Sequence, residues 1–313
     1  MNFQQLRYVR ETVRQGLNLT EAANKLFTSQ PGVSKQIREL ENELGVEIFV
    51  RRGKRLVALT EPGRMVVRII EDLLQLADNL RGAAREFQDQ ASGTLAVATT
   101  HTQARYSLPT VVRQFKRRYP KVHLTLKQGN PPQLAEMVLA GEADVAIATE
   151  ALDHYPKLLA LPGFQWNHCV VVPAKHPLAK SSRVTLEEVA RYPLITYDPA
   201  FAGRTHIDEA FAARGLHPDI VLSAIDADVI KTYVELDMGV GIVAAMAFDP
   251  KRDRGLRALD ASHLFKSNTT RIAIRRGAYL RGYAYAFIEL FSPQLSREVI
   301  DAALAGKGEM YEL

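Results

Sequence analysis

Apolar residues recur at helical spacing in the segment 18–55. From Pro31 onward they are separated by four, three and four residues, which places one apolar stripe along a helix. Pro31 suits the first turn of this helix, because the N–H that proline lacks would be unpaired there. The pattern predicts a helix that starts near Pro31 and packs against a neighbour through its stripe. The stripe consists of Val33, Ile37, Leu40 and Leu44.

A second, shorter helix is predicted to precede this one. It begins near Asn18, and its small residues Ala22 and Ala23 allow a neighbouring helix to cross closely. Thr28 and Ser29 form the turn between the two helices. Two short helices joined by a turn are typical of the helix-turn-helix, in which the second helix enters the major groove of DNA.

The polar side of the second helix and the basic stretch after it carry the chemistry of this segment. Gln30 and Ser34 lie near the N-terminal end of the helix, where a recognition helix meets base edges. The basic residues around Gly53 predict a wing whose charges meet phosphates beside the groove. A helical pair with a merely solvated basic face is the alternative. The predicted DNA contacts are Thr28, Ser29, Gln30, Pro31, Ser34, Lys35, Arg38, Arg51, Arg52 and Lys54.

A long heptad pattern follows in residues 60–91. Thr60 is placed to cap a helix, and Pro62 lies near its first turn. Beyond them, apolar residues alternate at steps of four and three, which is typical of a coiled-coil seam. We predict that this helix dimerises with its copy in a second chain; the alternative is a surface helix packed on its own domain. The predicted dimerisation residues are Val66, Ile70, Leu73, Ala77, Leu80, Ala84 and Phe87.

From Thr94 the pattern changes to short β-rich runs that alternate with helical stretches. This alternation predicts an α/β domain with largely parallel sheets. The predicted strands are 95–98, 122–126, 144–148, 169–173, 194–197 and 271–275. The predicted helices are 108–119, 133–140, 204–214 and 228–238.

Polar residues gather at three predicted strand ends, which is where α/β domains bind ligands. They are the run 100–103, Thr149 and the stretch 201–204. Hydroxyls, amides and backbone N–H groups at helix starts bind a small anion without a fixed counter-charge. Capping is the ordinary role of each threonine taken singly. Their shared position at strand ends favours a binding pocket.

Composition narrows the class of protein. The formal net charge is +5, and residues 1–68 hold 12 Lys and Arg against 7 Asp and Glu, so the basic excess belongs to the predicted DNA-binding segment. The single cysteine, Cys169, excludes an intramolecular disulfide and is predicted to be a buried small hydrophobe. No apolar stretch approaches the about 20 residues of a membrane span, and Met1 is followed by an amphipathic pattern rather than a signal peptide. We therefore expect a cytoplasmic protein without membrane contact.

No sequence motif of an enzyme, a metal site or a cofactor stands out. Gly239 and Gly241 form an isolated GxG, which we interpret as a turn before a strand. Asp226 and Asp228 flank a predicted helix start, where capping is their ordinary role. The histidines show no i, i+4 pair. We expect no catalytic residue, metal or cofactor, although residues 94–313 taken alone leave an enzyme or a solute-binding protein as alternatives.

The N-terminal segment resembles that of LysR-type transcriptional regulators. This resemblance implies an α/β protein with a winged helix-turn-helix over residues 1–59, a linker helix over 60–91 and an effector-binding domain over 92–313. The residues that carry it are Ala23, Leu26, Ser29, Gln30, Ser34, Ile37, Leu40, Glu41, Leu44, Gly45, Phe49 and Arg51.

Within that family the chain is similar to the CysB-type subgroup, regulators of sulfur assimilation and cysteine synthesis. The resemblance implies an effector domain like a periplasmic binding protein, with the ligand in a cleft between two subdomains. Subdomain I is expected at about 92–163 and 268–292, and subdomain II at about 164–267. The stretches that carry the resemblance are 100–106, 146–150, 164–168 and 226–233.

The same resemblance implies a ligand and partners. The effector would be an acetylserine or a related sulfur anion. The partners would be double-stranded promoter DNA, RNA polymerase and further copies of the chain, in a dimer or tetramer that mainly activates transcription. A paralogous regulator of sulfonate or sulfate-ester use, which senses sulfate or activated sulfate, is the alternative.

One position departs from the subgroup pattern. A threonine hydroxyl is often found in this subgroup where Ala202 stands, so one hydrogen-bond donor to the ligand is lost. The implied effector-binding residues are Thr100, Thr102, Gln103, Thr149, Trp166 and Ala202.

Overall fold

The structure is a computed structural model that describes residues 1–88 and 91–306, apart from the side chains of residues 87, 88, 150, 151 and 202. It divides into two compact units, Met1–Phe87 and Gln88–Leu313, each of which is considered by itself. The long helix belongs to the first unit and is described as far as Gln88, so the predicted boundary at residue 91 stays a prediction. Every helix in the described ranges is too short or too polar to cross a lipid bilayer.

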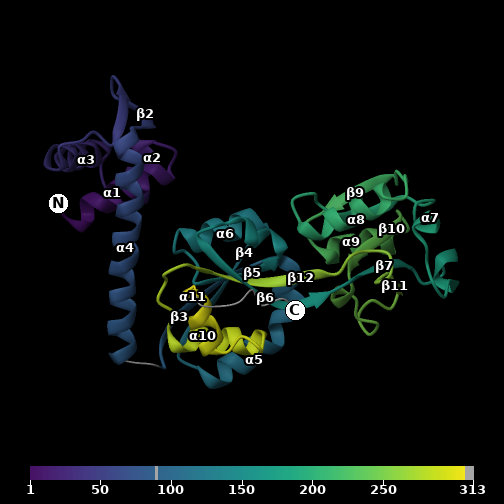
Figure 1. Ribbon diagram of the computed structural model, residues 1–313. Coiled ribbons are helices and arrows are strands. Elements are labelled where there is room, and N and C mark those ends of the chain that lie inside the picture. The colour runs from purple at the N-terminus through teal and green to yellow at the C-terminus, as the bar shows by residue number, and fades with distance from the viewer. Residues whose placement is uncertain (89–90, 307–313) are drawn as a thin grey trace. The chain divides into compact units, whose positions relative to one another are not determined.

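The first unit contains three short helices, a hairpin and one long helix (Figure 1). Asn18 and Ser29 cap the second and third helices with their side-chain oxygens, and Gly45 ends the third with a φ of 68°. The predicted helix-turn-helix and wing are therefore confirmed. Their bounds are α1 (Phe3–Arg14), α2 (Leu19–Lys25), α3 (Gln30–Leu44), β1 (Phe49–Arg52), β2 (Arg55–Leu59) and α4 (Glu61–Gln88).

The apolar stripe of α3 packs into the core of this unit. Val33, Ile37 and Leu40 are buried there, together with residues of α1 and α2. Leu44 is 39% exposed, so its predicted place in the stripe is wrong. It is the last residue of α3, and the chain reverses directly after it at Gly45.

A buried carboxylate fixes the hairpin to α3. Glu41 accepts hydrogen bonds from the backbone N–H groups of Ile48 (2.8 Å) and Phe49 (3.2 Å). Its other oxygen accepts from the guanidinium of Arg51 at 2.6 Å. The wing is therefore held by one side chain near the C-terminal end of α3, whereas the predicted DNA contacts of α3 lie in its N-terminal half.

The long helix α4 uses two different faces. Val67, Ile70 and Leu74 are buried in the core of the first unit, so the predicted role of Ile70 at a dimer seam is wrong. Val66 also packs partly against that core. Of the predicted seam, Leu73, Leu80 and Ala84 are exposed and Ala77 is partly exposed, whereas the side chain of Phe87 lies outside the described part. The large apolar residues exposed on α4 are Met65, Ile69, Leu73, Leu76 and Leu80.

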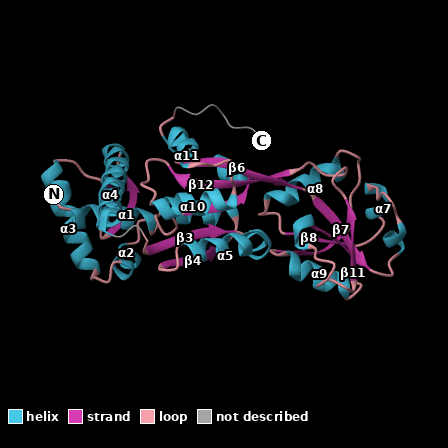
Figure 2. Cartoon of the chain, turned by 90° about the horizontal axis from the view of Figure 1, so that it is seen from below, coloured by secondary structure: helices cyan, strands magenta, loops and turns pink. Residues whose placement is uncertain are grey.

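The second unit contains two five-stranded sheets, one in each subdomain (Figures 1 and 2). The first sheet has the order β4-β3-β5-β12-β6 and the second β11-β7-β10-β8-β9. The strands of the first sheet are β3 (Gly93–Thr99), β4 (Val122–Gln128), β5 (Val145–Thr149), β6 (Leu158–Trp166) and β12 (Asn268–Arg275). Those of the second sheet are β7 (His168–Pro173), β8 (Leu194–Tyr197), β9 (Ile220–Ala224), β10 (Val240–Ala244) and β11 (Leu256–Asp260).

Helices cover both faces of each sheet. In subdomain I they are α5 (Leu108–Arg118), α6 (Pro131–Leu139), α10 (Gly282–Phe291), α11 (Arg297–Leu304), the π-helical turn η1 (Gln103–Ser107) and the 3-10 turn η2 (Glu150–His154). In subdomain II they are α7 (Leu186–Val189), α8 (Ala202–Ala212), α9 (Ala227–Glu235) and the 3-10 turns η3 (Pro177–Lys180) and η4 (Ala245–Ala247). In Figure 1, α6 lies on one side of the first sheet and α5 and α10 on the other, in agreement with two separate cores.

The sheets are mixed rather than largely parallel as predicted. β3 pairs in parallel with β4 and β5, and β8 with β9 and β10. The remaining pairings, which involve β6, β7, β11 and β12, are antiparallel. The parallel pairings were predictable from the sequence because helices separate the strands that form them. The antiparallel strands lie beside the crossings between the subdomains, where strand and helix do not alternate.

The chain crosses between the subdomains twice. It leaves the first sheet when β6 ends at Trp166 and returns when β12 begins at Asn268. The predicted end of the first segment, at residue 163, is therefore three residues short. Ile300 and Ala303 of α11 pack into the core of subdomain I, so this subdomain extends past the predicted residue 292.

Candidate functional site

The predicted DNA contacts at the start of α3 lie at the surface. Ser29 accepts from the N–H of Gly32 at 3.3 Å and so caps the helix. Lys35 and Arg38 are exposed, and Gln30 and Ser34 are partly exposed, on the side away from the buried stripe. Thr28 and Pro31 are exposed beside them, so the structure brings these predicted residues to one end and one face of α3.

A groove joins the helix starts to the hairpin. It is lined by Asn18 and Thr20 at the start of α2, by Gln30 of α3, and by Lys54 and Arg55 at the hairpin. Helix N-termini and basic side chains are both groups that bind phosphates. The groove therefore connects the N-terminal end of α3, which is predicted to contact bases, with a basic wing.

Two of the predicted wing residues differ in their surroundings. Arg52 is exposed and free to meet a phosphate. The side chain of Arg51 is 22% exposed and its guanidinium pairs with Glu41. Its prediction as a free phosphate contact is corrected: Arg51 anchors the wing.

Five of the six predicted effector residues line one cavity in the second unit. Its empty volume is about 400 Å³ including the open mouth. The lining residues are Thr100, Thr102, Gln103, Pro131, Thr149, Trp166, Tyr197, Phe201 and Gly203.

The described residues of the cavity wall carry hydrogen-bonding groups and no charge. The amide Nε2 of Gln103 donates to Thr270 at 2.9 Å, while its Oε1 is buried without a partner among the described residues. The indole Nε1 of Trp166 is likewise buried and without a described partner. Buried polar atoms rarely stay unpaired. With this amide orientation, a ligand that accepts from the indole and donates to the amide oxygen satisfies both atoms.

The amino end of α8 closes one side of the cavity. Phe201 precedes this helix and its side chain makes no capping hydrogen bond. A Cβ at Gly203 would lie 3.2 Å from ring atoms of both Trp166 and His168, so a larger residue would have to displace these rings by a few tenths of an ångström. The side chain of Ala202 lies outside the described part, and the prediction of a lost donor there stays a prediction.

Two titratable groups near the cavity are kept neutral by burial. Burial, with a small contribution from His206, lowers the pKa of His168 to about 3. Burial likewise raises the pKa of the Cys169 thiol to about 12. The prediction that Cys169 is a buried hydrophobe rather than a nucleophile is confirmed.

A polar cluster beside the cavity was not predicted as functional. Asp226 caps α9 as expected, by accepting from Val229 N at 2.9 Å. Asp228 instead contacts Arg105 and Tyr106 of the other subdomain. The stretches 100–106 and 226–233, which carry the resemblance to the CysB-type subgroup, contain these residues. The sequence does not show that the two stretches contact each other.

One group of side chains has the spacing of metal ligands. One ligand atom each of His101, Asp226 and Asp228 lie within 4.8 Å of one another, and all three residues are partly exposed. Because Arg105 and Tyr106 already occupy the carboxylate of Asp228, a cation there would have to displace them. The group carries no assignment as a metal site.

Both units match known families. Residues 3–64 match the bacterial regulatory helix-turn-helix protein, lysR family, and residues 88–296 match the LysR substrate binding domain. The chain is 62% identical to the HTH-type transcriptional regulator SsuR of Burkholderia cenocepacia over 98% of each chain. It is 60% identical to the regulator CysB of the same organism over the whole of both chains.

A solved structure supports the same conclusion. The crystal structure of the cofactor-binding domain of the Cbl transcriptional regulator is similar to 68% of this chain and 93% of its own length, with a TM-score of 0.66 and 48% identity. The helix-turn-helix with its wing and the two-subdomain effector unit thus agree with the matched families in order and extent. The chain belongs to the LysR family of DNA-binding transcriptional regulators and is not an enzyme.

Proposed function

We propose that this regulator mainly activates genes of sulfate assimilation and cysteine biosynthesis, and that a small sulfur-pathway metabolite controls it. The observation that carries the proposal is the convergence of Thr100, Thr102, Gln103, Thr149 and Trp166 on one cavity, whose described lining residues are uncharged. These are the residues that the CysB-type resemblance assigns to the effector. The proposed ligand is an acetylserine or a sulfur anion, and no other cofactor is involved.

The cavity chemistry suits these ligands in different ways. Neutral hydroxyls, the indole N–H and the start of α8 suit the negative end of either one. The unpaired Oε1 of Gln103 suits the ammonium group of an acetylserine, which sulfate lacks. We place acetylserine first because it satisfies both buried polar atoms.

The proposed mechanism links the cavity to DNA through the oligomer. Ligand binding changes the angle between the two subdomains of the second unit, and that change alters the spacing of the recognition helices in a dimer or tetramer. The altered spacing changes the bend of the promoter DNA and thereby recruits RNA polymerase. Each step is open to separate measurement.

The second candidate is a regulator of sulfonate or sulfate-ester use that senses sulfate or activated sulfate. The two Burkholderia relatives match the chain almost equally, so their similarity favours neither candidate. The choice between them therefore depends on which ligand binds.

Replacing Thr149 with valine removes one hydroxyl and keeps the side-chain shape. We expect effector affinity to fall roughly tenfold, since one hydrogen bond to an ionic ligand contributes about 1.5 kcal/mol or more. Promoter DNA binding in the absence of effector should stay within about twofold, because β5 belongs to the second unit. Fluorescence titration through Trp166, the only tryptophan, measures the first quantity, and a gel-shift titration the second.

Thr125 provides the matched control. It lies in β4 of the same sheet and does not line the cavity, so Thr125→Val should leave both affinities unchanged. If Thr149→Val retains full effector affinity, the cavity is not the effector site.

A further inference from the structure

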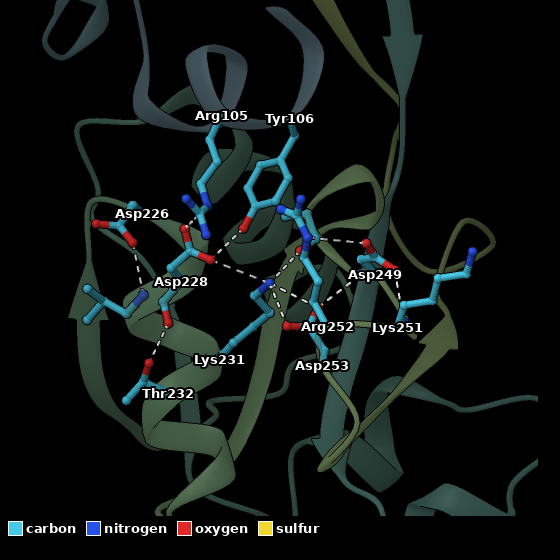
Figure 3. A network of polar contacts seen from close by, with 12 residues as sticks. Arg105, Tyr106, Asp226, Asp228, Lys231, Thr232, Asp249, Lys251, Arg252 and Asp253 are labelled. Carbon is cyan, nitrogen blue, oxygen red and sulfur yellow. Dashed lines mark hydrogen bonds and ion pairs between the residues drawn. The ribbon is translucent and has the colours of Figure 1, made fainter. Parts of the chain in front are cut away.

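A short π-helical turn connects the cavity wall with the opposite subdomain. η1 begins with Gln103, which is buried in the cavity wall, and continues with Arg105 and Tyr106, which reach subdomain II (Figure 3). π-helical turns are rare and occur mostly at functional sites. Because only one residue separates Gln103 from Arg105, a displacement of one end of η1 also moves the other.

One carboxylate of subdomain II receives both side chains. The hydroxyl of Tyr106 donates to Asp228 Oδ1 at 2.7 Å, and the guanidinium of Arg105 pairs with Oδ2. Burial raises the pKa of Tyr106, and the bond to Asp228 raises it further, so the hydroxyl remains a donor at neutral pH. Asp228 therefore holds two neighbouring residues of η1 at once.

Asp228 is itself held in place from within subdomain II. Lys231, whose side chain is 8% exposed, lies 3.5 Å from Asp228 and donates to both oxygens of Asp253 at 3.0 Å and to the backbone oxygen of Ala247 at 2.7 Å. Its ammonium also lies 5.4 Å from the centre of the Tyr106 ring. The carboxylate thus has a fixed position when η1 docks against it (Figure 3).

These contacts exist only while the two subdomains are close together. Arg105 and Tyr106 belong to subdomain I, and Asp228 and Lys231 belong to α9 of subdomain II. An isolated surface ion pair contributes little to stability. Here a hydroxyl and a guanidinium share one carboxylate beside a buried ammonium, so opening the cleft breaks several bonds in one step.

We propose that Asp228 is a positioning residue of the effector site: it docks η1 against subdomain II, keeps Gln103 in the cavity wall and so sets the affinity for the effector. The proposal rests on the proposed function of the cavity. The three residues Arg105, Tyr106 and Asp228 form what we name the η1 latch. Loss of the latch releases η1, and Gln103 with it, in a larger fraction of molecules, and this fraction lowers the apparent affinity.

The test uses the full chain and Trp166 fluorescence, with O-acetylserine, sulfate and thiosulfate as probes. Asp228→Ala is expected to weaken binding of the probe that the wild type binds by roughly 10- to 100-fold. Tyr106→Phe removes only the hydroxyl and is expected to weaken it roughly 3- to 10-fold. The double variant should bind like Asp228→Ala alone, because both changes remove the same bond. Asp228→Glu keeps the carboxylate and should recover part of the affinity.

Arg252→Ala is the matched control. Arg252 pairs with Asp249 at 3.6 Å in the same region, but within subdomain II. Its removal should change neither probe affinity nor thermal stability. A merely structural role predicts a different result. Asp228→Ala would then lose thermal stability in step with its loss of probe affinity, and Asp228→Glu would recover neither quantity. That result would overturn the proposal.

A readout without ligand separates this proposal from the proposed function. Amide hydrogen exchange of residues 103–107 in the unliganded full chain should accelerate at least roughly tenfold in Asp228→Ala and stay unchanged in Arg252→Ala. Unchanged exchange in Asp228→Ala overturns the latch whether or not any probe binds. If the wild type binds none of the probes while exchange responds as expected, the proposed sulfur effector is wrong and the latch stands.

Discussion

Replacing Glu41 with alanine is expected to destabilise the Met1–Phe87 unit by about 3–5 kcal/mol, the usual loss when one partner of a buried ion pair is removed. The change leaves the N–H groups of Ile48 and Phe49 without their acceptor and Arg51 without its counter-charge. The wing should detach from α3, and DNA affinity should fall with it. Urea denaturation of the full chain, followed by hydrogen exchange at β1, measures the loss.

Glu39 is the control on the same helix. Its carboxylate is 44% exposed and pairs with Lys35 at 3.8 Å, so Glu39→Ala should change stability by no more than about 0.5 kcal/mol. If Glu41→Ala unfolds at the same urea concentration as Glu39→Ala, the carboxylate does not hold the wing.

Aspartate in place of both Leu76 and Leu80 is expected to weaken self-association at least roughly 100-fold. These side chains are 62% and 73% exposed in one chain, so the change spares the fold of the unit itself. Burying one leucine at an interface contributes about 1.5–3 kcal/mol. The two substitutions remove this contribution for both leucines in each of the two chains. Sedimentation measures the association, and loss of paired half-site binding on DNA should accompany it.

Ala77→Asp distinguishes the exposed stripe from the seam predicted by the heptad pattern. Ala77 belongs to the predicted seam. In the structure it lies beside the exposed apolar stripe of α4, which contains Leu76 and Leu80. A mild effect, well below that of Leu76→Asp, is expected. If Ala77→Asp weakens self-association more than Leu76→Asp does, the seam predicted from the heptad pattern is correct.

The heptad pattern shows why part of the fold was predictable and part was not. Leu73 and Leu80 satisfy both the predicted seam and the observed exposed stripe. Periodicity alone cannot tell which side of a helix faces its own domain, and Ile70 was assigned to the wrong side because the core that buries it is built from α1 to α3. The position of a helix face thus follows from tertiary packing.

The cavity was predictable because its residues sit at strand ends in sequence. Thr100 and Gln103 follow β3 and Thr149 ends β5, and these two strands pair in parallel and therefore end at the same edge. Arg51 and Asp228 were misassigned for a different reason. Their partners, Glu41 and Arg105, lie 10 and 123 residues away along the chain, and no local pattern reveals which charges meet.

Calorimetric titration of the full chain with acetylserines, sulfate, thiosulfate and activated sulfate tests the central claim most directly. The account predicts one site per chain for one of these ligands, a change in Trp166 fluorescence at the same ligand concentration, and a changed complex with promoter DNA when that ligand is present. Binding of none of them, or binding that leaves both the fluorescence of Trp166 and the DNA complex unchanged, would contradict it.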